Sequence, residues 1–89
     1  YEPFVRALRE ALSSEKELTA AVATKNGAAF PNSALEVYDF VNVMSYDQCS
    51  WSEVACEQAS YADTLRDLEY WTKEKRVARS RVVLGVPFY

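Results

Sequence analysis

The segment Tyr38–Asp47, with the sequence YDFVNVMSYD, most constrains what this chain can fold into. Residues Phe40–Tyr46 contain no Gly or Pro, are rich in β-forming residues, and are apolar at every position except Asn42 and Ser45. This pattern predicts a strand covered on both faces, as strands of parallel α/β sheets are. The polar residues gather at the C-terminal end, up to Asp47, where parallel sheets and barrels carry their binding sites. We therefore expect the functional site there.

Helices and strands alternate along the whole chain. We expect helices over Glu2–Ser13, Ala34–Val37 and Tyr61 to about Lys75, and further strands over Leu18–Thr24 and Arg81–Tyr89, the last again covered on both faces. Loops are expected over residues 25–33 and 48–59. Residues 25–39 are long enough for the crossover of about a dozen residues that two parallel strands require, so the order α-β-α-β-α-β predicts an α/β fold with parallel strands.

Local patterns fix the helices more closely. Two apolar stripes predict the buried faces of the long helices, at Phe4, Leu8, Ala11 and Leu12 and at Tyr61, Leu65, Leu68 and Trp71. Ser33 with Glu36, and Ser60 with Asp63, have the spacing of capping boxes, so each serine is predicted as an N-cap.

The composition indicates a piece of a larger domain. With 89 residues, the chain is at most one domain, and a domain of this size has a marginal core. Yet 49% of its residues are hydrophobic and 13% are aromatic, which is high for a small free-standing domain. The chain also starts at Tyr1 rather than at a Met, so we expect a segment upstream.

The charge argues against several classes of partner. A net charge of -3 disfavours nucleic acid and anionic membrane surfaces, both of which require a basic patch. No apolar run reaches the roughly 20 residues of a membrane helix, and residues 1–89 contain no signal-peptide pattern. One basic cluster stands where the last helix should end, and we expect it to offset that helix's dipole: Lys73, Lys75, Arg76, Arg79 and Arg81.

Missing residue types narrow the chemistry. The chain has no His, which removes Ser-His-Asp and Cys-His nucleophile systems and leaves only two Cys and carboxylates for a zinc site. Gly27 and Gly85 are its only glycines, so no phosphate-cradling loop or dinucleotide fingerprint is present. We expect no cofactor and no metal. The remaining carboxylates, tyrosines and tryptophans are residues that bind and process sugars well.

Two motifs resemble successive strands of the family 18 glycoside hydrolases, the chitinases and their relatives. The sixth barrel strand of that family ends in Met-x-Tyr-Asp, matched by residues 44–47, and the seventh carries Gly-x-Pro-x-Tyr, matched by residues 85–89. Leu18–Thr24 falls where the fifth strand belongs. The resemblance covers essentially the whole chain and implies part of a (β/α)8 TIM barrel, from about the fourth helix to the seventh strand.

The resemblance also implies an activity and a role for each site residue. Enzymes of this family cleave β-1,4 links next to N-acetylglucosamine with retention, because the substrate's own acetamido carbonyl attacks the anomeric carbon. Tyr46 would donate its hydroxyl to that carbonyl, and Asp47 would contact the sugar near the scissile bond. Met44 and Tyr89 would line the same subsite. Strand alternation agrees, since Asn42, Met44 and Tyr46 share one face and Val41, Val43 and Ser45 share the other.

One departure from the family limits these expectations. The family's acid is the Glu that closes Asp-x-x-Asp-x-Asp-x-Glu on the fourth strand, and this motif does not occur in residues 1–89. We therefore expect no hydrolysis by this segment alone. Three readings stay open: a chitinase or related endo-β-N-acetylglucosaminidase acting on chitin or chitooligosaccharides, a lectin of the same fold that has lost the acid, and an α/β interaction module that binds no sugar.

Several residues also have a simpler interpretation. Met44 can be a core residue, because methionines commonly fill gaps between packed elements, and Asp47 alone can cap a turn. Trp51 can stack on a sugar or pack against a helix. Tyr70 and Trp71 are expected in the core. Cys49 and Cys56 either form a disulfide across a short loop, which would fit a secreted or periplasmic enzyme, or remain two free thiols.

Overall fold

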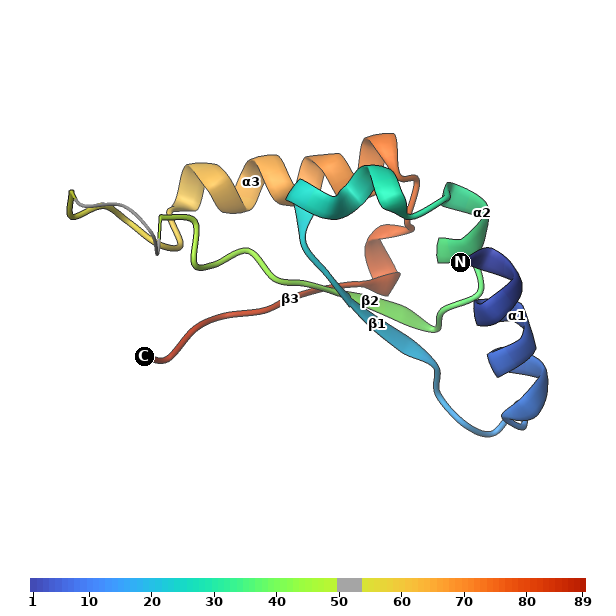
Figure 1. Ribbon diagram of the computed structural model, residues 1–89. Helices are drawn as coiled ribbons and strands as arrows, with labels where there is room; N and C mark the ends of the chain where they lie inside the picture. Colours follow the sequence, from blue (N-terminus) through green and yellow to red (C-terminus); the bar gives the residue numbers. More distant parts are fainter. Residues whose placement is uncertain (50–53) are drawn as a thin grey trace.

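The computed structural model describes residues 1–49 and 54–89, in which helices alternate with strands of one sheet (Figure 1). In chain order the elements are α1 (Glu2–Ala11), β1 (Thr19–Val22), the 3₁₀ helix η1 (Thr24–Ala29), α2 (Asn32–Leu35), β2 (Phe40–Val43), α3 (Tyr61–Glu69), the π-helix η2 (Tyr70–Glu74), the 3₁₀ helix η3 (Arg79–Arg81) and β3 (Val82–Leu84). The predicted order of helices and strands is confirmed. The prediction of loop over residues 25–33 is wrong for η1, where about two turns of 3₁₀ helix begin one residue after β1.

The sheet is parallel throughout, as predicted. Its order is β1-β2-β3, so β2 is the central strand of the three. Ala21 pairs with Asn42, which in turn pairs with Val83, and side chains in such a row point to the same face. The strands are shorter than predicted at their C-terminal ends, because the chain there leaves regular pairing and enters the segments that carry the candidate site.

Helices pack on one face of the sheet (Figure 1). On β2, Val41 and Val43 are fully buried, whereas Asn42 between them is only half-buried. The prediction that β2 is covered on both faces is therefore wrong for the described part of the chain, since the helices lie on one side and the opposite face is open. The buried core consists of Val5, Leu18, Val22, Leu35, Tyr38, Val41, Val43, Trp71 and Val77.

Trp71 is the largest fully buried side chain. Its indole Nε1 donates a hydrogen bond to Thr24 Oγ1 at 3.0 Å, which satisfies the one polar atom of the ring. The rings of Tyr70 and Phe30 flank it, with centroids 5.4 and 6.1 Å away. The predicted core placement of Trp71 is confirmed, and the half-buried Tyr70 packs at the edge of the same core.

Helix α1 confirms part of the predicted stripe: Leu8 and Leu12 pack against the core, whereas Phe4 and Ala11 are exposed. Val5 is 1% exposed, whereas Phe4, placed on the buried face from the sequence, is 67% exposed. Val5, Leu8 and Leu12 follow the i, i+3, i+7 spacing and share one face, with Phe4 about 100° away from Val5 around the helix. The sequence contained both stripes, and packing against the sheet selected the one with Val5.

One of the two predicted N-caps is correct. Ser60 is the N-cap of α3, where its Oγ accepts a hydrogen bond from the backbone N–H of Asp63 at 3.0 Å. Ser33 is not a cap, because α2 begins earlier, at Asn32, with Pro31 as its N-cap residue and no side-chain cap bond. The Ser33 hydroxyl instead donates to Glu2 Oε1 on α1.

The outer side of β3 is more exposed than its apolar sequence predicted. Val83 and Leu84 are 42% and 37% exposed, because Val83 shares the open face of the sheet with Asn42 and β3 is an edge strand of the described sheet. On α3, Tyr61 and Leu65 of the predicted buried stripe are also exposed. Side chains from α3, η2, η3 and β3 line an open, mostly apolar groove with a volume of 490 Å³: Leu65, Leu68, Glu69, Thr72, Lys73, Arg79, Val82 and Leu84.

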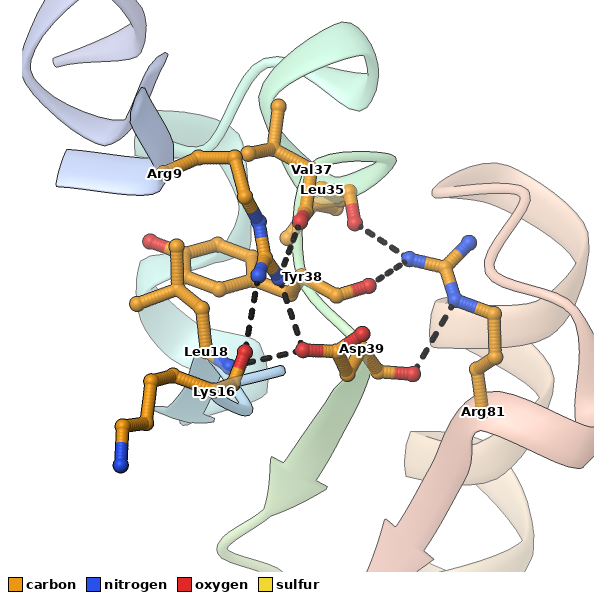
Figure 2. A network of polar contacts seen from close by, with 8 residues as sticks. All are labelled: Arg9, Lys16, Leu18, Leu35, Val37, Tyr38, Asp39 and Arg81. Atoms are coloured by element: carbon orange, nitrogen blue, oxygen red, sulfur yellow. Dashed lines mark hydrogen bonds and ion pairs between the residues drawn. The ribbon is translucent and has the colours of Figure 1, made fainter. Parts of the chain in front are cut away.

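A polar network ties together the N-terminal ends of the three strands (Figure 2). Asp39, directly before β2, accepts hydrogen bonds at 2.7 Å from both Arg9 Nη2 on α1 and the backbone N–H of Leu18. The hydrogen bonds from Arg9 and from the Leu18 amide hold the pKa of Asp39 below its ordinary value. No local sequence pattern links Arg9 to Asp39, which is 30 residues away.

Arg81 completes this network from the start of β3. It donates to the backbone carbonyls of Leu35 at 2.8 Å and of Tyr38, and to that of Asp39 at 3.4 Å (Figure 2). Leu35 ends α2, so Arg81 acts on the C-terminus of α2 rather than on the dipole of α3 as predicted. The network lies at the end of the strands opposite the candidate site, where barrels keep residues for stability.

Candidate functional site

The predicted site residues meet where the chain leaves β2 and β3. The Tyr89 hydroxyl donates a hydrogen bond to Asp47 Oδ1 at 2.8 Å, which joins two residues 42 positions apart in the sequence. Both segments leave the sheet in the same direction because the strands are parallel (Figure 1). The C-terminal ends of the two motif-bearing strands are therefore neighbours.

Sheet pairing extends past the ends of the strands and sets which side chains face the site. The backbone N–H of Met44 donates to the Val22 carbonyl at 2.8 Å, and that of Gly85 to the Val43 carbonyl at 2.9 Å. Beyond β2 the alternation thus continues. Ser45 is 2% exposed against α3, while Met44 and Tyr46 are half-buried on the open face of the sheet. This is the alternation expected from the sequence.

Met44, Tyr46 and Asp47 line one hollow with a volume of 330 Å³. The rest of its wall comes from the segment after β1, from the residue after Asp47 and from α3: Ala23, Thr24, Lys25, Asn26, Gln48 and Asp67. Carboxylate, amide, hydroxyl and ammonium groups thus converge beside one aromatic ring and one thioether. Such a mixture of hydrogen-bonding groups with an aromatic face suits a polyhydroxylated ligand. The larger groove between α3 and β3 contains none of the predicted site residues.

The Asp47–Tyr89 pair has its own electrostatics. Because Asp47 accepts the hydrogen bond from the Tyr89 hydroxyl, the proton is held and the pKa of Tyr89 is raised above its ordinary value of 10.0. Tyr89 is 78% exposed, so water competes for this contact. Asp47 has a left-handed backbone with φ of 56°, a conformation that Asp tolerates better than most residues. That turn directs its carboxylate toward β3.

Comparison with known proteins agrees with the resemblance of the two motifs. Residues 1–89 match the family described as glycosyl hydrolases family 18. The chain belongs to this family. No curated protein sequence matches it significantly.

Two solved structures extend the family 18 assignment to the fold. A chitinase from Bacteroides thetaiotaomicron superimposes with a TM-score of 0.88 at 31% identity, over 97% of this chain and 27% of its own. The family 18 chitinase ChiB from the chitin utilization locus of Flavobacterium johnsoniae gives 0.86 at 34% identity, over 99% of this chain and 29% of its own. The helices and parallel sheet are thus part of a TIM barrel, and the chain spans less than a third of the length of these chitinases.

Two hydrogen bonds around the family 18 motif were not predicted. Gln58 Oε1 accepts from the backbone N–H of Asp47 at 3.3 Å, and Gln48 Nε2 donates at 3.3 Å to Asp67 Oδ2 on α3. Asp67 is only 8% exposed. Each of these contacts spans more than ten residues of sequence, so no local pattern indicates them.

The two cysteines beside the motif are joined. Cys49 and Cys56 form a disulfide with their Cα atoms 6.4 Å apart, which decides between the two alternatives that the sequence left open. Trp51, predicted to contact sugar, lies outside the described residues. Within residues 1–49 and 54–89, no cluster of three or more His, Cys, Asp or Glu is arranged to hold a metal ion. Likewise, the described part of the chain has no helix long and apolar enough to cross a membrane.

Proposed function

We propose that residues 1–89 form a central part of a family 18 catalytic barrel, in a protein that hydrolyses β-1,4-linked N-acetylglucosamine polymers with retention. The observation that carries this proposal is the Asp47–Tyr89 hydrogen bond beside Tyr46, at the C-terminal ends of two adjacent parallel strands. Barrel enzymes bind substrate at this end. The two similar structures, both described as chitinases, support the substrate class.

Tyr46 has the central role in this proposal. Among the described residues, no group hydrogen-bonds its hydroxyl, so that hydroxyl is available to donate to the acetamido carbonyl of a bound sugar. Holding the carbonyl in line promotes its attack on the anomeric carbon, and the hydrogen bond strengthens as charge develops in the transition state. Asp47 contacts the reacting sugar, Met44 forms the floor beneath it, and Tyr89 holds Asp47 in place.

The test is Tyr46→Phe in the complete protein, with hydrolysis of a chitooligosaccharide as the readout. We expect kcat to fall by roughly 10²–10³-fold, as when one preorganised donor to a developing charge is removed. Tyr61→Phe is the matched control, because Tyr61 is 79% exposed on the first turn of α3. Unchanged kcat in Tyr46→Phe would remove Tyr46 from the mechanism.

A second function is a lectin of the same fold. Residues 1–89 do not include the fourth strand, which carries the Asp-x-x-Asp-x-Asp-x-Glu motif in the family, and a barrel of this family that has lost that Glu binds sugar without cleaving it. The residue that closes the motif upstream distinguishes the two: Glu predicts an enzyme, and Gln or Leu predicts a binder. In either case we expect the isolated segment to release no sugar. A protein that neither binds nor cleaves chitooligosaccharides would instead be an interaction module.

We also propose that the protein is exported, to the periplasm or the medium. The Cys49–Cys56 disulfide supports this, because structural disulfides persist in oxidising compartments and are rare in the cytosol. Fractionation of producing cells tests it, and recovery of the protein only from the cytosol would contradict it.

A further inference from the structure

One side chain outside the two motifs joins the segments that carry them. Gln58 Oε1 accepts the backbone N–H of Asp47 at 3.3 Å, and Gln58 Nε2 donates to the backbone carbonyl of Tyr89 at 3.5 Å. Its own backbone carbonyl accepts the N–H of Gln48 at 3.0 Å. A single half-buried residue thus contacts the chain beyond β2 and the chain beyond β3.

The chemistry of these contacts requires an amide. The Asp47 backbone offers a donor and the Tyr89 backbone offers an acceptor, so the bridging side chain must accept on one side and donate on the other. Gln has both groups on one planar terminus, whereas a carboxylate lacks the donor and an aliphatic side chain lacks both. The two partners also fix which end of the amide faces which strand.

The position of Gln58 is itself fixed from both directions. Cys56, two residues before it, is covalently joined to Cys49, which lies two residues after Asp47. Ser60, two residues after it, is the capped start of α3. Gln58 is therefore fixed between a disulfide and the start of a helix, so its side-chain amide can fix the position of the two backbone groups that it contacts.

We propose that Gln58 is a positioning residue of this site, which fixes the ends of β2 and β3 relative to each other so that Asp47 and Tyr89 remain paired beside Tyr46. Gln58 is not among the residues that line the hollow. It acts through the backbone of Asp47 and Tyr89, which it bridges. Its effect on turnover rests on the proposed function, but its effect on the Asp47–Tyr89 pair does not.

The experiment replaces Gln58 in the complete protein and follows Tyr89 directly. Gln58→Met keeps the length of the side chain and removes both polar groups, while Gln58→Asn keeps both groups on a stem too short to span the two strands. Glu57→Gln, at the exposed neighbouring position, is the control. The Tyr89 ring is titrated by NMR with ¹³C-labelled tyrosine, and its signal is assigned by its absence in Tyr89→Phe.

We expect the titration midpoint of Tyr89 to move down toward that of an ordinary tyrosine in both Gln58 variants and to stay unchanged in Glu57→Gln. We also expect kcat on a chitooligosaccharide to fall about tenfold or more, because small displacements of positioned groups are costly. An unchanged Tyr89 midpoint in either folded Gln58 variant overturns the proposal, whatever the turnover. If the midpoint moves but the unmodified protein neither cleaves nor binds chitooligosaccharide, the positioning role stands and the proposed function fails.

Discussion

The ring of Tyr46 lies directly over Gly85. A Cβ atom placed on Gly85 would be 3.0 Å from Cε1 of Tyr46 and 3.1 Å from the carbonyl oxygen of Val43. Gly85 has no positive φ, so this glycine is required by close approach and not by backbone conformation. The two sequence motifs thus fit against each other: the glycine of one leaves space for the tyrosine of the other.

Gly85→Ala in the complete protein should therefore displace the Tyr46 ring while leaving the strand paired. The backbone oxygen of Val43 cannot yield easily, so the ring has to move by some tenths of an ångström. We expect kcat/KM on a chitooligosaccharide to fall roughly tenfold, since misplacement of a positioned group is costly. Val86→Ala, at an adjacent exposed position, should keep normal kcat/KM. Equal activity in both variants would contradict the steric role of Gly85.

The sequence predicted the parallel α/β order, the two motif-bearing strand ends and the Ser60 cap because each depends on local pattern. Strand periodicity fixed which face carries Met44 and Tyr46. Capping geometry fixed the start of α3. Parallel strands then had to bring the segments after β2 and β3 to the same edge of the sheet, where Asp47 and Tyr89 meet.

The sequence could not predict features for which two local patterns are equally good and tertiary packing decides between them. Helix α1 has two apolar stripes, and contact with the sheet decides for Val5 over Phe4. Ser33 has a good capping spacing, but its hydroxyl bonds Glu2 on another helix. The role of Gln58 depends on hydrogen bonds to two backbone groups, 11 and 31 residues away. Residue types do not indicate such bonds, because the backbone groups are the same in nearly every residue.

Gly27 predicts a stability effect away from the site. A Cβ at this buried position would overlap the hydroxyl oxygen and Cε1 of Tyr70, whose ring packs edge-on against Trp71. Gly27→Ala should lower the free energy of unfolding by about 1–3 kcal/mol, the usual range for overpacking. Urea unfolding followed by tryptophan fluorescence measures this loss. Tyr70→Leu should recover part of it, and additive effects of the two substitutions would argue against the contact.

The disulfide predicts a thiol count and a cost on removal. Denatured without reductant, the chain should show no reactive thiols at Cys49 and Cys56, and two after reduction.

On the chain-entropy account, closing a loop of this length contributes roughly 2.5 kcal/mol to stability, so a Cys49→Ser, Cys56→Ser protein should unfold at a lower urea concentration. Because the bridge holds the Gln58 segment, the same double substitution should also lower the titration midpoint of Tyr89. Two reactive thiols before reduction would refute the pairing.

Asp39 predicts how stability changes in acid. Its hydrogen bonds to Arg9 and to the Leu18 amide hold its pKa in the folded protein below the ordinary 3.8. A lowered folded pKa means that the stabilisation is fully present above pH 3.8 and is lost as pH falls below it through the folded pKa. Asp39→Asn keeps the shape of the side chain and removes its charge. Its free energy of unfolding should therefore be lower than that of the unmodified protein at pH 6. This difference in free energy of unfolding, the gap, should narrow between pH 4 and 2. Urea unfolding across this range measures the gap. Glu15→Gln is the control, because it removes one charge at an exposed position in the turn after α1 without touching the network around Asp39. A gap for Asp39→Asn that stays constant with pH would show that its carboxylate is not linked to folding.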